Sequence, residues 1–162
     1  LEQSSKQKRL WVIDIEKKDV LYNTYVSHGK RSGNEYAKQF SNRQDSNMSS
    51  PGFYVTKETY TGKHGLSLKL DGLDEGFNTN ARERCIVMHG AEYASESTIE
   101  KLGFLGRSEG CPAIPVELHE AIISQVAGKT CIFVNAPVGN YKSAYLNQNK
   151  AVQEFMKDQK FS

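Results

Sequence analysis

The sequence predicts one domain that is mainly β with short helices, an α+β fold. Most apolar residues fall in short runs, several of which alternate with period two, and Gly, Asp, Asn and Ser separate these runs. Stretches with helical spacing are few and short. The length of 162 residues suits one domain and is enough for a sizeable core.

The chain is expected to begin with a polar, disordered segment at residues 1–8 and then to form a β-hairpin. Its two strands are predicted at Leu10–Ile15 and Val20–Val26, because both runs are rich in β-branched and aromatic residues and a short polar turn joins them.

A short helix is predicted after the hairpin. Asn34 is a suitable N-cap, and Tyr36 and Phe40 have the i,i+4 spacing that places them on one helical face. Residues 41–50 are polar and lack periodicity, so they are expected to form a mobile rim loop.

The middle of the chain predicts three strands and one helix: strands at 53–60, 66–70 and 85–88, and a helix from Ser95 or Ser97 to Leu102. A second helix is predicted after Pro115, which suits a first helical turn. Leu118, Ile122 and Val126 form its apolar face, and Gly128 ends it.

The last predicted strand is 130–134. Residues 138–162 are expected to be a C-terminal extension packed on the same domain, with a helix at 151–156. No linker or repeat divides the chain, so residues 1–162 are interpreted as one catalytic domain.

Composition argues against several function classes. The formal net charge is +2 and the basic residues are scattered, which does not favour nucleic-acid binding. No apolar run approaches the roughly 20 residues of a transmembrane helix, so no transmembrane segment is expected. The four histidines lack the spacing of a zinc site, so neither a metal nor another cofactor is predicted.

The chemistry is expected at Cys111. Gly110 and Pro112 flank it, which is typical of an exposed turn, and His89 ends the apolar run 85–88. A histidine at a strand end can accept the thiol proton of a cysteine on another loop, so the two residues predict acyl transfer. The alternative is that Cys111 is a small buried apolar residue.

The other two cysteines, Cys85 and Cys131, lie within apolar runs and are expected to be inert core thiols. An odd number of cysteines leaves at least one thiol without an intrachain partner, which fits a nucleophile better than a disulfide framework.

Several motifs together resemble the L,D-transpeptidase catalytic domain of bacterial cell-wall enzymes. These are the His-Gly pair at 89–90, the Ser-x-Gly-Cys pattern at 108–111 and the Ser-Pro-Gly-Phe stretch at 50–53. The similarity extends from about Arg9 to Pro137. Glu109 stands where that family commonly has His, and Pro-Ala-Ile at 112–114 replaces the usual residues, so the chain is similar to a divergent branch of murein L,D-transpeptidases.

The resemblance implies a β-sandwich-like core and a reaction on peptidoglycan stem peptides through a Cys111 thioester. It implies that the Gly90 carbonyl orients His89, that the donor is cut before a terminal D-alanine, and that the protein acts in the periplasm or extracellular cell envelope. Backbone N–H groups around Gly110 and Cys111 would receive the oxyanion.

Four neighbouring side chains have open interpretations. Arg107 and Lys63 either bind a substrate carboxylate or are solvated surface charges. Ser108 either donates to the substrate or holds the turn, and His64 either lines the cleft or is an exposed turn histidine.

Three alternatives remain for the function. The reaction could be L,D-carboxypeptidation, in which water replaces the acceptor amine. A sortase-like cysteine enzyme also has His before Cys, but it needs an arginine soon after the cysteine, and no arginine follows Cys111. The last alternative is a non-catalytic cell-wall-binding β domain.

Overall fold

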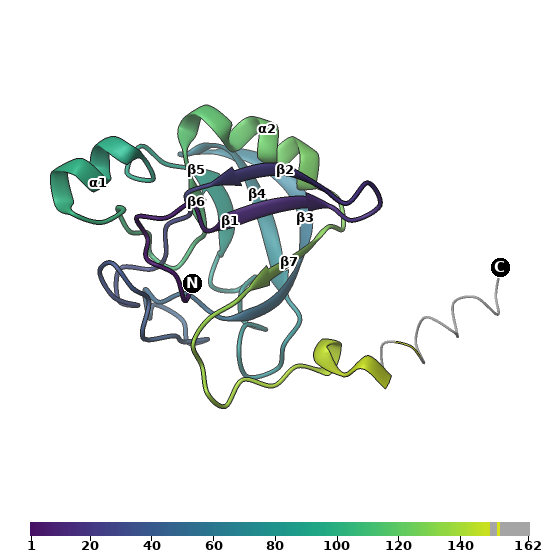
Figure 1. Ribbon diagram of the computed structural model, residues 1–162. Helices are drawn as coiled ribbons and strands as arrows, with labels where there is room; N and C mark the ends of the chain where they lie inside the picture. The colour runs from purple at the N-terminus through teal and green to yellow at the C-terminus, as the bar shows by residue number, and fades with distance from the viewer. Residues whose placement is uncertain (150–151, 153–162) are drawn as a thin grey trace.

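The structure, a computed structural model, describes residues 1–149 and 152. A two-stranded hairpin lies beside a five-stranded sheet with the order β6-β5-β4-β3-β7 (Figure 1). The strands are β1 (Leu10–Asp14), β2 (Asp19–Thr24), β3 (Gly52–Gly62), β4 (Gly65–Gly72), β5 (Val87–Gly90), β6 (Ala113–Ile114) and β7 (Cys131–Val134). The helices are α1 (Glu96–Leu102), α2 (Val116–Val126) and the short 3-10 helix η1 (Ala144–Leu146). The mainly β prediction with short helices is confirmed.

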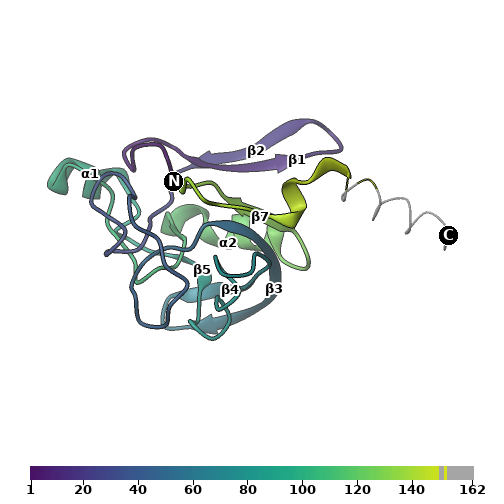
Figure 2. The ribbon, with the colours of Figure 1, turned by 90° about the horizontal axis from the view of Figure 1, so that it is seen from below.

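The hairpin and the larger sheet form separate layers, as the view from below shows (Figure 2). Neighbouring strands are antiparallel except β5 and β6, which are parallel. β3 and β4 are the longest strands. Their pairing has a register shift between Thr56 and Thr59 of β3. Such irregularities increase local twist, which suits a sheet that curls around its core.

The core fills the space between the sheet, α2 and the inner side of the hairpin. Its buried members include Val26, Tyr54, Leu68, Leu70, Ile86, Met88, Ile114, Ile122, Ile123 and Val126. Full burial of one such side chain contributes about 1.5–3 kcal/mol of hydrophobic free energy. The core therefore fixes β5 and β6, the two strands that carry the predicted site, against α2.

The second predicted helix is present. Ile122 and Val126 are buried, and Leu118 packs partly against the core. Ile123 is also fully buried, so the apolar face is wider than the expected stripe. The helix ends at Val126, and Gly128 then adopts a φ of 82°, a left-handed conformation that reverses the chain cheaply only at glycine.

The predicted helix after Asn34 does not form. Gly33 has a φ of 147°, and the polar groups of this segment bond to distant parts of the chain. The Asn34 side-chain oxygen accepts from Arg107, and the Glu35 carboxylate accepts from Ser4 Oγ at 2.6 Å. These tertiary contacts outweigh a weak local helical preference.

The first eight residues differ from the expected disordered segment. Ser5 is fully buried, its N–H donates to the Glu35 carbonyl at 2.9 Å, and its Oγ accepts from the Leu105 N–H at 3.3 Å. A polar composition was misleading here because the hydroxyls are satisfied inside the protein.

Two residues of the predicted C-terminal extension contact the loop after β4, and packing of the whole extension stays a prediction. Tyr141 and Ser143 donate their hydroxyls to the Asp74 carboxylate at 2.7 and 2.5 Å. The ring of Tyr141 also packs edge-on against Phe77, with 5.0 Å between centroids. The helix predicted at 151–156 lies outside the described residues except for Val152.

Candidate active site

The cysteine turn leads directly into β6, beside β5. His89 pairs with Ala113 in the parallel register, so Cys111 lies two residues before the partner of His89. The Val87 N–H points at Cys111 Sγ at 3.5 Å, and the thiol points at the Cys85 carbonyl at 3.7 Å. Cys111 and His89 therefore lie on neighbouring segments at one edge of the sheet, offset along the ladder.

The turn itself is held by Ser108. Its Oγ donates to the Cys111 carbonyl at 2.6 Å and accepts from the Gly110 N–H at 3.1 Å. Gly110 has a φ of 126°, and a Cβ there would lie 2.9 Å from the Met48 carbonyl oxygen. A side chain at residue 110 would thus be strained and crowded. Of the two roles left open for Ser108, the structure contains the one that holds the turn.

The Cys111 thiol is less exposed than the sequence suggested. The residue is half-buried and packs against the core, although the flanking Gly and Pro predicted an exposed turn. Burial raises the pKa of the Cys111 thiol, while the Val87 N–H and the Arg84 charge act in the opposite direction. The thiol is therefore protonated at neutral pH.

His89 is buried and has a defined tautomer. Its Nδ1 lies 2.9 Å from the Gly90 carbonyl, which can only accept, so Nδ1 carries the proton and Nε2 has a free lone pair in the neutral ring. Burial lowers the pKa of His89, although the bond to the Gly90 carbonyl opposes that change. The ring is therefore neutral at pH 7. It makes no hydrogen bond to Cys111 in this structure.

Two other histidines lie close to His89. The turn between β3 and β4 places His64 against it, with 4.2 Å between ring centroids and 21° between planes. His119 of α2 packs on the other side of the strand end, where its Cγ would be 2.7 Å from a Cβ at residue 90. The close approach of α2 therefore requires glycine at residue 90, and the main-chain carbonyl of that residue also holds His89.

The charges around the turn divide into two groups. Lys63 is near enough to His89 to contribute to the lowering of the pKa of His89. Arg107 instead donates through Nη1 to Asn34 and to the Gly33 carbonyl, the latter at 3.2 Å, and Glu109 forms an exposed ion pair with Lys30 at 2.7 Å. Substrate binding by Lys63, His64 and Arg107 stays a prediction.

Arg84 is a site residue that the sequence did not reveal. Its guanidinium donates to the Met48 carbonyl at 2.6 Å, to Ser46 Oγ at 3.1 Å and to the Ser41 carbonyl at 2.8 Å. The 41–50 loop is thus fastened to the segment that precedes β5, where a mobile rim was expected. Arg84 also lowers the pKa of the Cys111 thiol, against the larger effect of burial. Only its place before a cysteine could have drawn attention to it.

The other two cysteines are exposed, which corrects the expectation of inert core thiols. Cys85 lies before β5, in a turn where its φ is 54°, and Cys131 lies on the edge strand β7. Cys131 alternates with core-facing residues, so its side chain points to the outer face of the sheet.

This exposure predicts the order of alkylation. With limiting iodoacetamide at pH 7.5, we expect Cys85 and Cys131 to react several-fold faster than Cys111, because the Cys111 thiol is buried and protonated. Peptide mass spectrometry of quenched samples measures the three rates. Faster alkylation of Cys111 than of both exposed thiols would show that it rests as a thiolate.

A buried histidine lies directly under the turn. Ser27 and Gly29 form bridges to Ala113 and Ser108, and His28 between them is 1% exposed. Arg9 donates to its Nδ1 at 2.8 Å, so its Nε2–H donates to the Gly33 carbonyl at 3.2 Å. Burial, with the nearby Arg9 charge, lowers the pKa of His28 to about 4.

His28 predicts a loss of stability in mild acid. In the unfolded chain the imidazole binds a proton near pH 6.5, whereas in the fold it does so only near pH 4. The free energy of unfolding should therefore fall by about 3 kcal/mol as the pH drops from 6.5 to 4. Urea unfolding at both pH values measures this, with His28→Asn as the control that keeps an acceptor for Arg9. An equal loss in this variant would contradict the assignment.

Residues 1–149 and 152 contain no group of three or more His, Cys, Asp or Glu side chains that could hold a metal ion. Within the same residues, no helix is long and apolar enough to cross a membrane.

Comparison with known proteins identifies the family. Residues 1–135 match the L,D-transpeptidase catalytic domain. No curated protein sequence matches the chain. Among solved structures, the fold is similar to the structure of Bd1075 from Bdellovibrio bacteriovorus, with 15% sequence identity and a TM-score of 0.44. The similarity covers 97% of this chain and 60% of the Bd1075 chain. The chain thus spans 60% of the length of Bd1075. The family match covers most of the chain, including the cysteine turn and the His89 strand, so the chain belongs to the L,D-transpeptidase catalytic domain family.

Proposed function

We propose that the protein is an L,D-transpeptidase that acts on peptidoglycan stem peptides through a thioester on Cys111, with His89 as general base and then general acid. One observation carries the proposal: the Gly90 carbonyl holds the Nδ1 proton of His89, which leaves Nε2 as a base one strand away from Cys111. Membership of the family supplies the substrate class.

In the first step, the Cys111 thiol gives its proton to His89 Nε2 while Sγ attacks the amide carbonyl before the terminal D-alanine. Burial favours the neutral form of both groups, so the resting pair is thiol and imidazole and not an ion pair. The proton then moves as the sulfur attacks. A small rotation of the side chains is needed, because Sγ points at Val87 and Cys85 before substrate binds.

The oxyanion that forms needs a donor. The Gly110 N–H, which the sequence suggested, is already bonded to Ser108 Oγ. The Cys111 N–H has no hydrogen-bond partner within the described residues, and it belongs to the nucleophile itself, so we assign the oxyanion to it. One such donor is worth roughly 3–4 kcal/mol to the transition state.

In the second step, the carbon–nitrogen bond breaks and His89 returns the proton to the amine of the departing D-alanine. The acyl group remains on Sγ as a thioester. An acceptor amine, deprotonated by His89, then attacks the thioester and forms the new cross-link; attack by water gives carboxypeptidation instead.

Lys63 and His64 form the side of the site next to His89, and we assign the substrate carboxylate to Lys63. Arg107 is less suited to this role because Asn34 and backbone carbonyls already take up its Nη1. We further propose that residues 1–162 act as one catalytic domain and that the protein works in the periplasm or extracellular cell envelope, where this substrate lies.

The proposal is tested with purified muropeptides that end in a diamino acid and D-alanine. We expect release of D-alanine and, with a second muropeptide as acceptor, a new cross-linked product that mass spectrometry detects. A product that is only the shortened peptide would identify a carboxypeptidase. Binding to peptidoglycan without any product would identify a non-catalytic domain.

A further inference from the structure

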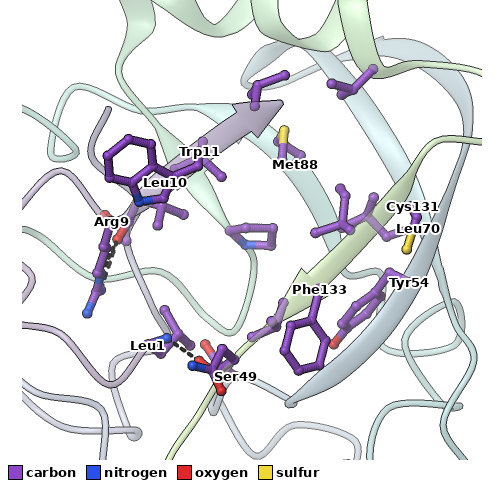
Figure 3. A pocket seen from close by; sticks show the side chains of 18 of the residues that line it. Leu1, Arg9, Leu10, Trp11, Ser49, Tyr54, Leu70, Met88, Cys131 and Phe133 are labelled. Carbon is purple, nitrogen blue, oxygen red and sulfur yellow. Dashed lines mark hydrogen bonds between the residues drawn. The ribbon is translucent and has the colours of Figure 1, made fainter. Parts of the chain in front are cut away.

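A groove runs between β1 and β7, and its lining includes Gly110 and Pro112, the two neighbours of Cys111. It has a volume of about 440 Å³, and Figure 3 shows the two strands along its sides. Every residue from Leu10 to Ile13 and from Thr130 to Asn135 lines it. Side chains of consecutive strand residues point to opposite faces, so a space touched by all of them lies along the strand edges. This β1–β7 groove therefore separates two strand edges.

Among the described residues, neither edge is paired with a strand across the groove. β7 is the last strand of its sheet and bonds only to β3, while β1 bonds only to β2. Thr130 accepts from the Thr56 N–H, so the pairs that exchange hydrogen bonds with β3 continue at every second residue, Ile132 and Val134. The N–H and C=O groups of Cys131 and Phe133 consequently point away from β3 and into the groove.

One outward group in the same series already has a partner of the expected kind. The carbonyl of Asn135, two residues after Phe133, accepts a hydrogen bond from the nitrogen of Leu1. Figure 3 shows Leu1 at this end of the groove. The ammonium nitrogen of Leu1 thus shows that the edge following β7 is open to a donor from a separate stretch of chain.

The floor of the groove is the hydrophobic core. Leu70, Met88, Ile122 and Val126 line it, and the inward side chains of Ile132 and Val134 join them. An occupant with apolar side chains at alternate positions would cover this floor. The same occupant would need polar main-chain groups at its two edges, which a peptide strand has and a lipid chain lacks.

Two charged side chains, those of Arg9 and Glu2, line the groove with Leu1. Arg9 donates to the Val26 and Gln3 carbonyls and to His28, all neutral acceptors, and forms no ion pair within the described residues. Burial lowers the pKa of Arg9 to about 10, at which it is still charged at neutral pH. A carboxylate on the occupant would complement this charge.

We propose that the β1–β7 groove binds an extended peptide segment of a partner protein, about four residues long, which pairs with the outer edge of β7 at Cys131 and Phe133. Its alternate apolar side chains lie on the core floor, and a carboxylate lies at the Arg9 end. The length follows from β7, which has four residues. The occupant is not the stem peptide of the proposed reaction, although the groove lies beside the cysteine turn, since Gly110 and Pro112 line it.

The test uses a fluorescent hexapeptide with an N-terminal lysine, alternating threonine and valine, and a free C-terminal carboxylate. We expect saturable binding by fluorescence anisotropy, with chemical-shift changes at the Cys131 and Phe133 amides. Two N-methylated peptides of the same sequence test main-chain pairing. One is methylated at the odd-numbered residues and the other at the even-numbered residues. One of these two peptides should bind roughly tenfold more weakly than the unmethylated peptide, because its methyl groups replace the N–H donors that face β7.

Two matched controls separate the contributions. Phe133→Pro removes one outward N–H and should weaken binding roughly tenfold, whereas Phe133→Ala, which changes only the outer side chain, should not. An amidated peptide should bind more weakly than the free carboxylate. Equal binding of both N-methylated peptides, or no saturable binding, would overturn the proposal. Displacement of the peptide by dodecanoate, with N-methylation having no effect, would identify a lipid groove instead.

Discussion

Replacement of Cys111 by alanine is expected to reduce turnover of muropeptides by at least a thousandfold, because the variant has no atom that can form the thioester. Serine at this position should be nearly as inactive, since neutral His89 is matched to a thiol and not to a less acidic hydroxyl. The measurement is D-alanine release under saturating substrate, with thermal unfolding to confirm that the variants fold.

Cys85→Ser and Cys131→Ser provide the matched controls, because both thiols are exposed and neither has a role in the proposed chemistry. Each should retain turnover close to that of the parent enzyme. The double variant is also the best background for all labelling experiments, since it leaves Cys111 as the only thiol. Near-normal turnover by Cys111→Ala would exclude the proposed mechanism.

His89→Gln should lower kcat/KM by roughly 100- to 10,000-fold, the usual contribution of general acid–base catalysis. The pH profile adds a test that a purely structural role would not pass. Burial lowers the pKa of His89 below its ordinary value of 6.5, so the parent should keep its activity as the pH falls to about 6.5 and lose it only at lower pH. Glutamine cannot be protonated in this range.

The residual activity of His89→Gln should therefore lack this acid limb. His64→Gln serves as the control, because it removes the stacked ring but leaves the proposed base. An acid limb of unchanged position in His89→Gln would assign the limb to another group and contradict the role of His89.

The sequence was sufficient to predict the elements whose pattern is local. The hairpin follows from two β-branched runs around a polar turn, and α2 follows from Pro115, the Ile122–Val126 face and Gly128. The family resemblance, which rested on the His89 strand end and the cysteine turn, was also confirmed. These features depend on residue type and spacing, which the sequence displays directly.

The errors have a common physical cause. Cys85 lies in an apolar run, but a left-handed turn at this residue delays the strand to Val87 and exposes the thiol. Asn34 has the character of a helix cap, but its side chain binds Arg107 instead. In each case a partner or turn from outside the local window decides the conformation, and the pattern within that window does not contain it.

The site shows the same limit. The neutral state of Cys111 results from burial against the core, and the fastening of the 41–50 loop results from Arg84. Gly110 and Pro112 correctly indicated a turn, but they do not reveal how deep that turn lies. Burial is a property of the assembled fold, and it decides which protonation state the nucleophile has at rest.

The central claim is that Cys111 forms a thioester with the stem peptide. The most direct measurement is rapid acid quench of the Cys85→Ser, Cys131→Ser enzyme with a tetrapeptide muropeptide, followed by digestion and peptide mass spectrometry. We predict an adduct on the Cys111 peptide with the mass of the donor minus D-alanine, which disappears as product forms and is cleaved by hydroxylamine. Full turnover with an unmodified Cys111 peptide at every time point would contradict the account.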